Sequence, residues 1–305
     1  MTDEPGVPTL RCAVASLRRG DPMPGTAAPA AGFLLLEQPG GWGRQALTSS
    51  RLDPAVGATV SARAIAQGLR ALLIRAPGRR ESPGRFATPV RRRWAVVSSR
   101  LGRETTWWGD FGADDELVGL PLDGSAGIRS DEQFYLVCTH GRHDTCCAVE
   151  GRPVAAALDR LRPGRVWECS HVGGDRFAAN VLAMPHGLYY GRVTPAAAAR
   201  LVDAYERGDV VPELLRGRTL TPPAAQAALA HARKVLGENR LDALTAAGTI
   251  HLGDGRWQVR IRRSPRNLIA TVRASASPEP GLLTCHAVNP AHAPVFEVVE
   301  LVEVG

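Results

Sequence analysis

The sequence contains very little lysine, few aromatic residues and no long apolar run. Lys234 is the single lysine, so the net charge of +7 depends almost entirely on arginine. No stretch approaches the roughly 18 consecutive apolar residues of a membrane-spanning helix. The acidic start of the chain also lacks the basic and apolar regions of a secretory signal. We therefore expect a cytoplasmic protein that does not span a membrane.

Several common functional motifs are also missing. The chain has no G-x-x-x-x-G-K-[S/T], G-x-G-x-x-G or H-E-x-x-H sequence, and no carboxylate pair of the kind that glycosidases use. Arginine clusters occur at 75, 79 and 80 and at 91–93, but no aromatic residues are interleaved with them as in RNA-binding motifs. We expect no nucleic-acid partner. These arginines are interpreted as a solvated basic face or as a docking surface for an acidic redox partner.

Cysteine and histidine are concentrated in one part of the chain. Four of the six cysteines and three of the eight histidines lie between positions 138 and 171. Six cysteines are too few for a disulfide scaffold in a large intracellular chain, and free thiols can bind metals. Cys12 and Cys285 lie far from the others, so we expect each to be a plain buried or partly exposed thiol.

The distribution of apolar runs and turn residues predicts three units, at 1–130, 131–218 and 219–305. In the first unit, apolar runs predict strands at 33–37, 70–75 and 94–98, and helical spacing predicts a helix at 62–69. The acidic stretch 110–116 predicts a surface loop. Strands that alternate with helices indicate an α/β unit.

The second unit has the clearest pattern. A strand at 133–137 places Cys138 at its C-terminal end, and a helix at 152–160 has Pro153 near its start, where a missing N–H costs nothing. The elements predicted to follow are a strand at 165–171, a hairpin of 180–184 and 188–193, and a helix at 195–205. This order matches a thioredoxin-like unit whose ligands come from loops at one end of the sheet.

In the third unit we expect an alanine-rich helix and a small antiparallel sheet, with no chemistry of their own. The predicted elements are a helix at 223–235 and strands at 248–252, 257–262, 268–272 and 296–304. The fold class is therefore α/β, or α+β overall. A thioredoxin-like domain is preceded by an α/β domain and followed by a small α+β domain.

The spacing of the thiols indicates which of them share a site. Eight residues separate Cys138 from Cys147, enough for a loop to fold back and present both sulfurs to one metal centre. Neighbouring residues in an extended loop point in opposite directions, so Cys146 is expected to lie outside that site. Odd positions of the strand 165–171 share a face, so Cys169 could assist His171 or pack beneath it. Thiolates and imidazoles suit zinc or an iron–sulfur cluster.

Three segments, 138–147, 170–178 and 190–193, resemble the sucrase/ferredoxin-like family, thioredoxin-like ferredoxins that carry a [2Fe–2S] cluster. Arg11-Cys12, 40–44 and 73–75 are similar to the N-terminal region of that family. Its pattern is Cys, eight residues, Cys, then His-x-Gly-Gly-His-x-Phe-Ala. By position, Cys138 and Cys147 match the two thiolates and His171 matches the first histidine. Asp175 stands where the second histidine belongs.

The resemblance favours a non-catalytic electron carrier over an enzyme. Such a carrier would exchange electrons with a partner protein. Its [2Fe–2S] cluster would be held by Cys138, Cys147, His171 and a fourth ligand, which can be Asp175, Cys169 or an exogenous group. His140 and His143 are expected to support these ligands or to face solvent. The alternatives are a binding module stabilised by zinc at the same residues and a thiol oxidoreductase, which the absence of C-x-x-C disfavours.

Overall fold

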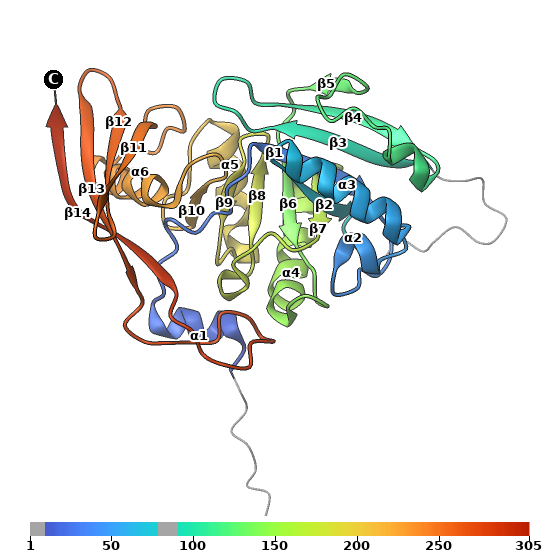
Figure 1. Ribbon diagram of the computed structural model, residues 1–305, viewed down its shortest axis with the longest axis horizontal. Coiled ribbons are helices and arrows are strands. Elements are labelled where there is room, and N and C mark those ends of the chain that lie inside the picture. Colours follow the sequence, from blue (N-terminus) through green and yellow to red (C-terminus); the bar gives the residue numbers. More distant parts are fainter. Residues whose placement is uncertain (1–9, 79–90, 305) are drawn as a thin grey trace, which may run out of the picture.

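The computed structural model describes residues 10–78 and 91–304. Their strands form a ten-stranded mixed sheet and a separate four-stranded antiparallel sheet (Figure 1). Within these residues no helix has both the length and the apolar character needed to cross a membrane. The architecture confirms the predicted α/β fold class with a small α+β part at the C-terminal end.

The N-terminal half contributes five strands to the large sheet. Its elements are α1 (Cys12–Arg19), β1 (Gly32–Glu37), α2 (Ala46–Ser49), α3 (Pro54–Ala66), β2 (Leu69–Arg75), β3 (Arg92–Ser98), β4 (Thr105–Phe111), the 3-10 helix η1 (Asp114–Leu117) and β5 (Ile128–Ser130). The predicted strands β1, β2 and β3 are confirmed. The helix predicted at 62–69 begins earlier, because the Asp53 carboxylate accepts hydrogen bonds from the first-turn N–H groups and Pro54 occupies the first helical position.

The region predicted as an acidic loop at 110–116 is only partly a loop. Strand β4 continues to Phe111, and η1 follows. The Glu116 carboxylate accepts hydrogen bonds from the N–H groups of Gly112 and Ala113. These bonds fix the short turn between β4 and η1. The acidic residues there therefore organise backbone at the end of a strand.

The central part has the strand order of a thioredoxin-like unit. Its elements are β6 (Phe134–Cys138), α4 (Thr145–Leu161), β7 (Val166–Cys169), the 3-10 helix η2 (Asp175–Phe177), β8 (Val181–Met184), β9 (Leu188–Tyr190), the 3-10 helix η3 (Pro195–Ala197), α5 (Ala198–Glu206) and β10 (Leu215–Arg218). Strands β6 and β7 are parallel and joined by α4, whereas β8 runs antiparallel to β6 and to β9. The predicted order of strand, helix, strand, hairpin and helix is confirmed.

Helix α4 is longer than the helix predicted at 152–160. It begins at Thr145, because the Asp144 carboxylate accepts the Cys146 N–H at 2.8 Å and caps the first turn. Pro153 is consequently inside the helix, and the prediction that it lies near the start is wrong. As a further consequence, Cys146 and Cys147 occupy the first turn of a helix and not an extended loop.

The two halves of the large sheet share part of their apolar core. Helices α4 and α5 cover one face of the thioredoxin-like strands, and α3 packs on the N-terminal strands. A third cluster joins side chains of both halves, among them Phe33, Leu35, Leu136 and Leu182. Strand β2 pairs with β7 through Ile74 and Arg75, which makes the sheet continuous. The domain boundary at residue 130 remains a prediction, and the strands on either side of it belong to one sheet.

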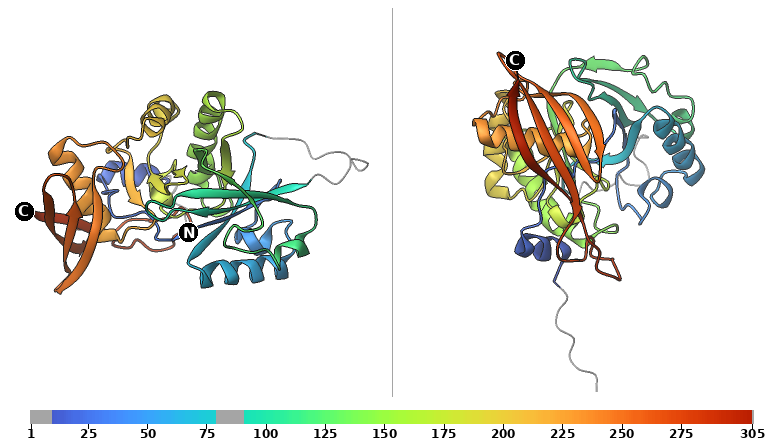
Figure 2. Two further views of the ribbon diagram at one scale, coloured as in Figure 1. Left: turned by 90° about the horizontal axis from the view of Figure 1, so that it is seen from above. Right: turned by 60° about the vertical axis from the view of Figure 1, so that its left-hand side comes forward.

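The C-terminal part lies at one end of the molecule (Figure 2). It consists of α6 (Pro223–Leu236), β11 (Thr245–Gly253), β12 (Arg256–Arg262), β13 (Asn267–Ala276) and β14 (Pro294–Val304). The four strands form an antiparallel sheet in sequence order, and α6 packs on its apolar face, as predicted. The connection between β13 and β14 leaves this sheet and reaches α1 (Figure 1).

Candidate metal centre

The residues predicted as ligands come from four places at one end of the thioredoxin-like strands. Cys138 is the last residue of β6, and Cys147 lies in the first turn of α4. His171 follows the end of β7, and Asp175 begins η2. Cys138, Cys147 and Asp175 are buried, and His171 is half-buried. The fold therefore brings the four residues together, while their roles as ligands remain predictions.

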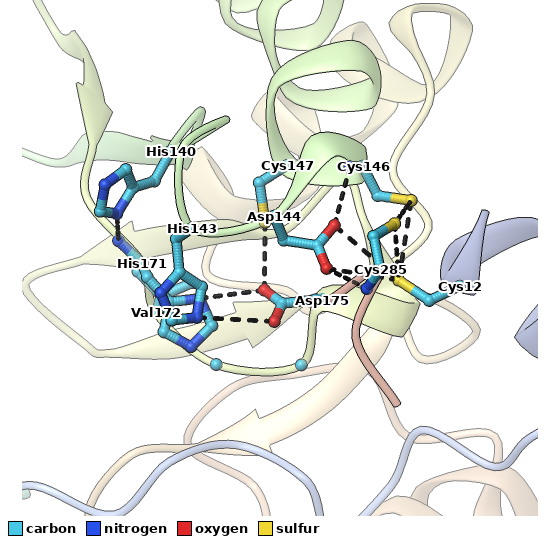
Figure 3. Close-up of polar contacts among 12 residues, drawn as sticks. Cys12, His140, His143, Asp144, Cys146, Cys147, His171, Val172, Asp175 and Cys285 are labelled. Carbon is cyan, nitrogen blue, oxygen red and sulfur yellow. Dashed lines mark hydrogen bonds and ion pairs between the residues drawn. The ribbon is translucent and has the colours of Figure 1, made fainter. Parts of the chain in front are cut away.

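The donor atoms of Cys147, His171 and Asp175 lie close to one another (Figure 3). One atom from each of Cys138, Cys147 and His171 lies within 4.8 Å of the others. The Asp175 Oδ1 atom is 2.9 Å from His171 Nδ1 and 3.2 Å from Cys147 Sγ. Asp175 is thus in direct contact with two of the other predicted ligands.

His143 takes a larger part in the site than the sequence indicated. Its ring stacks on that of His171 with centroids 3.6 Å apart, and its Nε2 atom is 3.7 Å from Asp175 Oδ2. His143, His171 and Asp175 form a second group with ligand atoms within 4.8 Å of one another. The sequence signal for this role was the position of His143 among the eight residues between Cys138 and Cys147.

His140 holds the backbone of the site. It is buried, its Nε2 atom lies 2.7 Å from the Gly43 carbonyl oxygen, and its Nδ1 atom accepts the His171 N–H at 3.3 Å. The acceptor role of Nδ1 assigns the ring proton to Nε2, which donates to Gly43. His140 therefore supports His171 as predicted, and links the site to the N-terminal half.

Cys169 packs beside the site. It stands opposite Cys138 on the neighbouring parallel strand, and both belong to the core shared by the two halves of the sheet. Burial and the nearby Cys138 raise the pKa of the Cys169 thiol. Among the described residues, the groups able to hold a metal do not include it. The predicted shared face of the strand holds for Trp167 and Cys169. The strand predicted at 165–171 is too long, because β7 ends at Cys169 and His171 lies beyond it.

The titratable groups of the site shift one another's pKa values. A hydrogen bond from Cys147 and the neighbouring His171 lower the pKa of Cys138, although burial opposes this effect. Burial by itself would lower the pKa of His171, but Asp175 and Cys138 raise it to about 9. Burial would likewise raise the pKa of Asp175, whereas His171 keeps it below the usual range. Cys138, His171 and Asp175 therefore favour one another's charged forms.

The donor set fits a transition-metal centre. Thiolate sulfur and imidazole nitrogen are the ligands of zinc and of iron–sulfur clusters. His171 Nδ1 is buried and has no hydrogen bond within residues 10–78 and 91–304, although a carboxylate oxygen lies 2.9 Å away. His171 and Asp175 are thus close enough to bind the same cation.

Buried arginines hold the loop between His171 and Asp175. Arg70 donates to the carbonyl oxygens of His171 and Val172, both at 2.9 Å. Arg216 is only 1% exposed and donates to the Gly173 carbonyl oxygen at 2.8 Å. Gly174 adopts a left-handed conformation with φ +79°, directly against the Arg216 guanidinium. The hydrogen bonds of Arg70 and Arg216 therefore hold the loop in place.

Three further thiols, those of Cys12, Cys146 and Cys285, lie in contact with one another. The side chain of Cys146 points away from that of Cys147 (Figure 3), and its sulfur belongs to a different group of potential ligands from Cys138. This geometry agrees with the prediction that only one of the adjacent thiols faces the site. Cys12 and Cys285, expected to be plain thiols, instead meet Cys146 on the other side of α4. The C-terminal part, in which no chemistry was expected, therefore contributes a thiol to a cysteine cluster.

The arginine clusters are partly engaged inside the molecule. Arg75 forms an ion pair with Glu168 at 2.7 Å, and Arg92 forms one with Asp114 at 2.5 Å. Arg93 stacks on Trp108. Arg79 and Arg80 lie outside the described residues. A continuous basic face built from these clusters remains a prediction.

Fold and site together define a thioredoxin-like α/β protein with a thiol- and histidine-rich metal-capable centre. The sequence matches the sucrase/ferredoxin-like family over residues 23–217, more than half of the chain, and the protein belongs to that family. It has no match among the curated proteins.

Two solved structures give partial likenesses to the chain. One is a thioredoxin-like [2Fe–2S] ferredoxin from Aquifex aeolicus, 19% identical, with a TM-score of 0.26; the match covers 31% of this chain and 97% of that chain. The other is a cysteine-to-serine variant of that ferredoxin, also 19% identical, with a TM-score of 0.25 and coverage of 28% and 97%.

Proposed function

We propose that the protein is a single-electron carrier whose [2Fe–2S] cluster is bound by Cys138, Cys147, His171 and Asp175. The observation that carries the proposal is the convergence of two buried thiols, an imidazole and a carboxylate at one end of the thioredoxin-like strands. Membership of the sucrase/ferredoxin-like family supports it. A bound cluster of this type supplies a site that takes up and releases one electron at a time.

Asp175 is the best-placed candidate for the fourth ligand. It contacts His171 and Cys147, whereas Cys169 packs in the core beside Cys138. A carboxylate carries a negative charge that a neutral imidazole does not. It should therefore hold the reduction potential below that of a site with two histidines.

We place the docking face for a redox partner where the site reaches the surface. His143 and His171 line an open hollow together with Arg44 and Gln45, and their side chains are 32% and 24% exposed. Arg44 and Arg142 are exposed beside these histidines. Positive charge around the rim favours a partner protein with an acidic surface.

Anaerobic purification followed by iron and sulfide analysis tests the proposal. We expect about two irons and two sulfides per chain and a red-brown sample. Cys138→Ser and Cys147→Ser should each lose the cluster. Cys169→Ser is the matched control, because this thiol is equally buried on the neighbouring strand, and it should retain the cluster. Zinc without sulfide in the purified protein would replace the proposal with a zinc-stabilised binding module.

Variants of Asp175 test the fourth ligand separately. Asp175→Ala should lose or destabilise the cluster, whereas Asp175→His should keep it at a raised reduction potential, since the anionic ligand is removed. Protein-film voltammetry and electron paramagnetic resonance measure both effects. Unchanged spectra in both variants, together with iron loss in Cys169→Ser, would assign the fourth ligand to Cys169.

A further inference from the structure

We infer that the protein has a second metal site, for a single thiophilic ion such as Zn²⁺, formed by Cys12, Cys146, Cys285 and Asp144. The site lies on the opposite side of the first turn of α4 from the centre described above (Figure 3). Cys12 begins α1, Asp144 caps the start of α4, and Cys146 lies in the first turn of that helix. Cys285 comes from the connection between β13 and β14. The sequence separations of Cys146 from Cys12 and Cys285 are 134 and 139 residues.

The three sulfur atoms have the spacing of ligands on one ion. The Sγ–Sγ distances are 3.7 Å for Cys12–Cys146, 3.6 Å for Cys12–Cys285 and 3.3 Å for Cys146–Cys285. Thiolates bound to zinc at about 2.3 Å in a tetrahedron lie roughly 3.8 Å apart. A disulfide requires about 2.05 Å. A four-iron cluster places each ligating sulfur on a different iron, which spreads the sulfurs beyond mutual contact.

Asp144 completes the set with an oxygen. It is fully buried, and its two carboxylate oxygens lie 3.8 and 3.7 Å from Cys12 Sγ. Oδ1 accepts the Cys146 N–H at 2.8 Å and Oδ2 accepts the Cys285 N–H at 2.6 Å. These two hydrogen bonds aim the carboxylate at the thiols. A buried carboxylate beside two buried thiols and one half-buried thiol opposes their ionisation, and a divalent cation offsets that repulsion.

The surroundings are those of a structural site. Cys12 and Cys146 are fully buried, and only Cys285 is partly accessible, which provides an entry path for the ion. Four protein ligands leave no open position for a substrate, and closed sets of this kind stabilise folds. A bound ion would link α1 and the β13–β14 connection to the first turn of α4. Cys147, which follows Cys146 in that turn, faces the proposed cluster.

The test separates the two sites by measuring zinc and iron in the same samples. The full-length protein and its variants are purified anaerobically from cells supplied with Zn²⁺, and both metals are quantified by mass spectrometry. Cys285→Ser should lose one zinc per chain and keep its iron, whereas Cys138→Ser should keep that zinc and lose its iron. This comparison remains valid if the proposed cluster is absent, because the loss of one zinc in Cys285→Ser is counted on its own.

A binding measurement keeps the inference falsifiable if a buried variant folds poorly. Cys285→Ser alters the most accessible ligand, and Asp144→Asn preserves a side chain that can cap α4. After removal of metal, titration with Zn²⁺ should give an affinity at least about 100-fold weaker in Cys285→Ser than in the parent, beyond the range for loss of a supporting group. A smaller decrease is expected for Asp144→Asn. Equal zinc content and affinity in the parent and Cys285→Ser, or a Cys146–Cys285 disulfide in the freshly purified protein, would overturn the inference.

Discussion

Replacing Gly174 by alanine tests whether the turn before Asp175 is held rigidly against Arg216. Gly174 has φ +79°, and an added Cβ would lie 2.3 Å from Arg216 Nη2 and 2.6 Å from Cζ. The guanidinium cannot move aside freely, because it is buried and donates hydrogen bonds to Thr26, Gly173 and Asn180. The left-handed conformation costs alanine about 1–2 kcal/mol, partly offset by about 0.4–1 kcal/mol from the restricted unfolded chain. Overpacking adds about 1–3 kcal/mol.

The control is Gly208→Ala. Gly208 has the same φ of +79°, but an added Cβ meets nothing within 4 Å. We therefore expect this variant to lose about 1 kcal/mol of unfolding free energy. Gly174→Ala should lose about 2–4 kcal/mol, because the steric conflict is added to the backbone cost. Urea denaturation followed by circular dichroism measures both values. Equal losses in the two variants would show that the Arg216 side chain yields easily and that the turn is not rigidly supported.

Two further predictions concern residues that are not among the candidate metal ligands. His186 lies with its Nδ1 atom 2.6 Å from the Tyr205 hydroxyl, and burial lowers its pKa. The contribution of neutral His186 to stability is therefore complete above about pH 6.5 and is lost as the pH falls below that value. His186→Gln should flatten the pH dependence of urea midpoints measured between about pH 5 and pH 7.5; an unchanged slope would contradict this assignment. Arg75→Met should cost about 3–5 kcal/mol, because it leaves the Glu168 carboxylate buried without its ion-pair partner. The double variant with Glu168→Leu should recover most of that loss, and an equally unstable double variant would argue against this cause.

Strands with simple patterns were predictable from the sequence. The run from Phe33 to Leu36 is fully buried in β1, and its flanking turn residues marked the end of the strand. The strand that ends at Cys138 was found in the same way. In both cases the information is local, because every residue of the run is apolar and the boundary residues favour turns.

The start of α4 was missed because one residue has two interpretations. Asp144 lies among cysteines and histidines, so the segment was interpreted as a metal-binding loop. The same Asp144 caps the helix, and the first turn of α4 carries both Cys146 and Cys147. Helix capping and metal binding use the same residue types, and the sequence alone does not separate them.

The meeting of Cys12 with Cys285 could not be predicted by local reasoning. These residues are 273 positions apart, and no periodicity relates them. Their contact depends on the path of the connection between β13 and β14, which extends beyond its own sheet to α1 (Figure 1). Only the full tertiary arrangement contains that information.

The pairing of β2 with β7 limits how the thioredoxin-like unit can be used outside this chain. Residues 131–218 expressed alone would expose the edge of β7 that now pairs with Ile74 and Arg75. They would also expose Leu136 and Leu182, which now pack in the core shared with β1 and β2. An unprotected strand edge beside an apolar face promotes aggregation. Transplanting the thioredoxin-like unit into a designed fusion would therefore require new polar residues on that face, or transfer of the N-terminal strands with it.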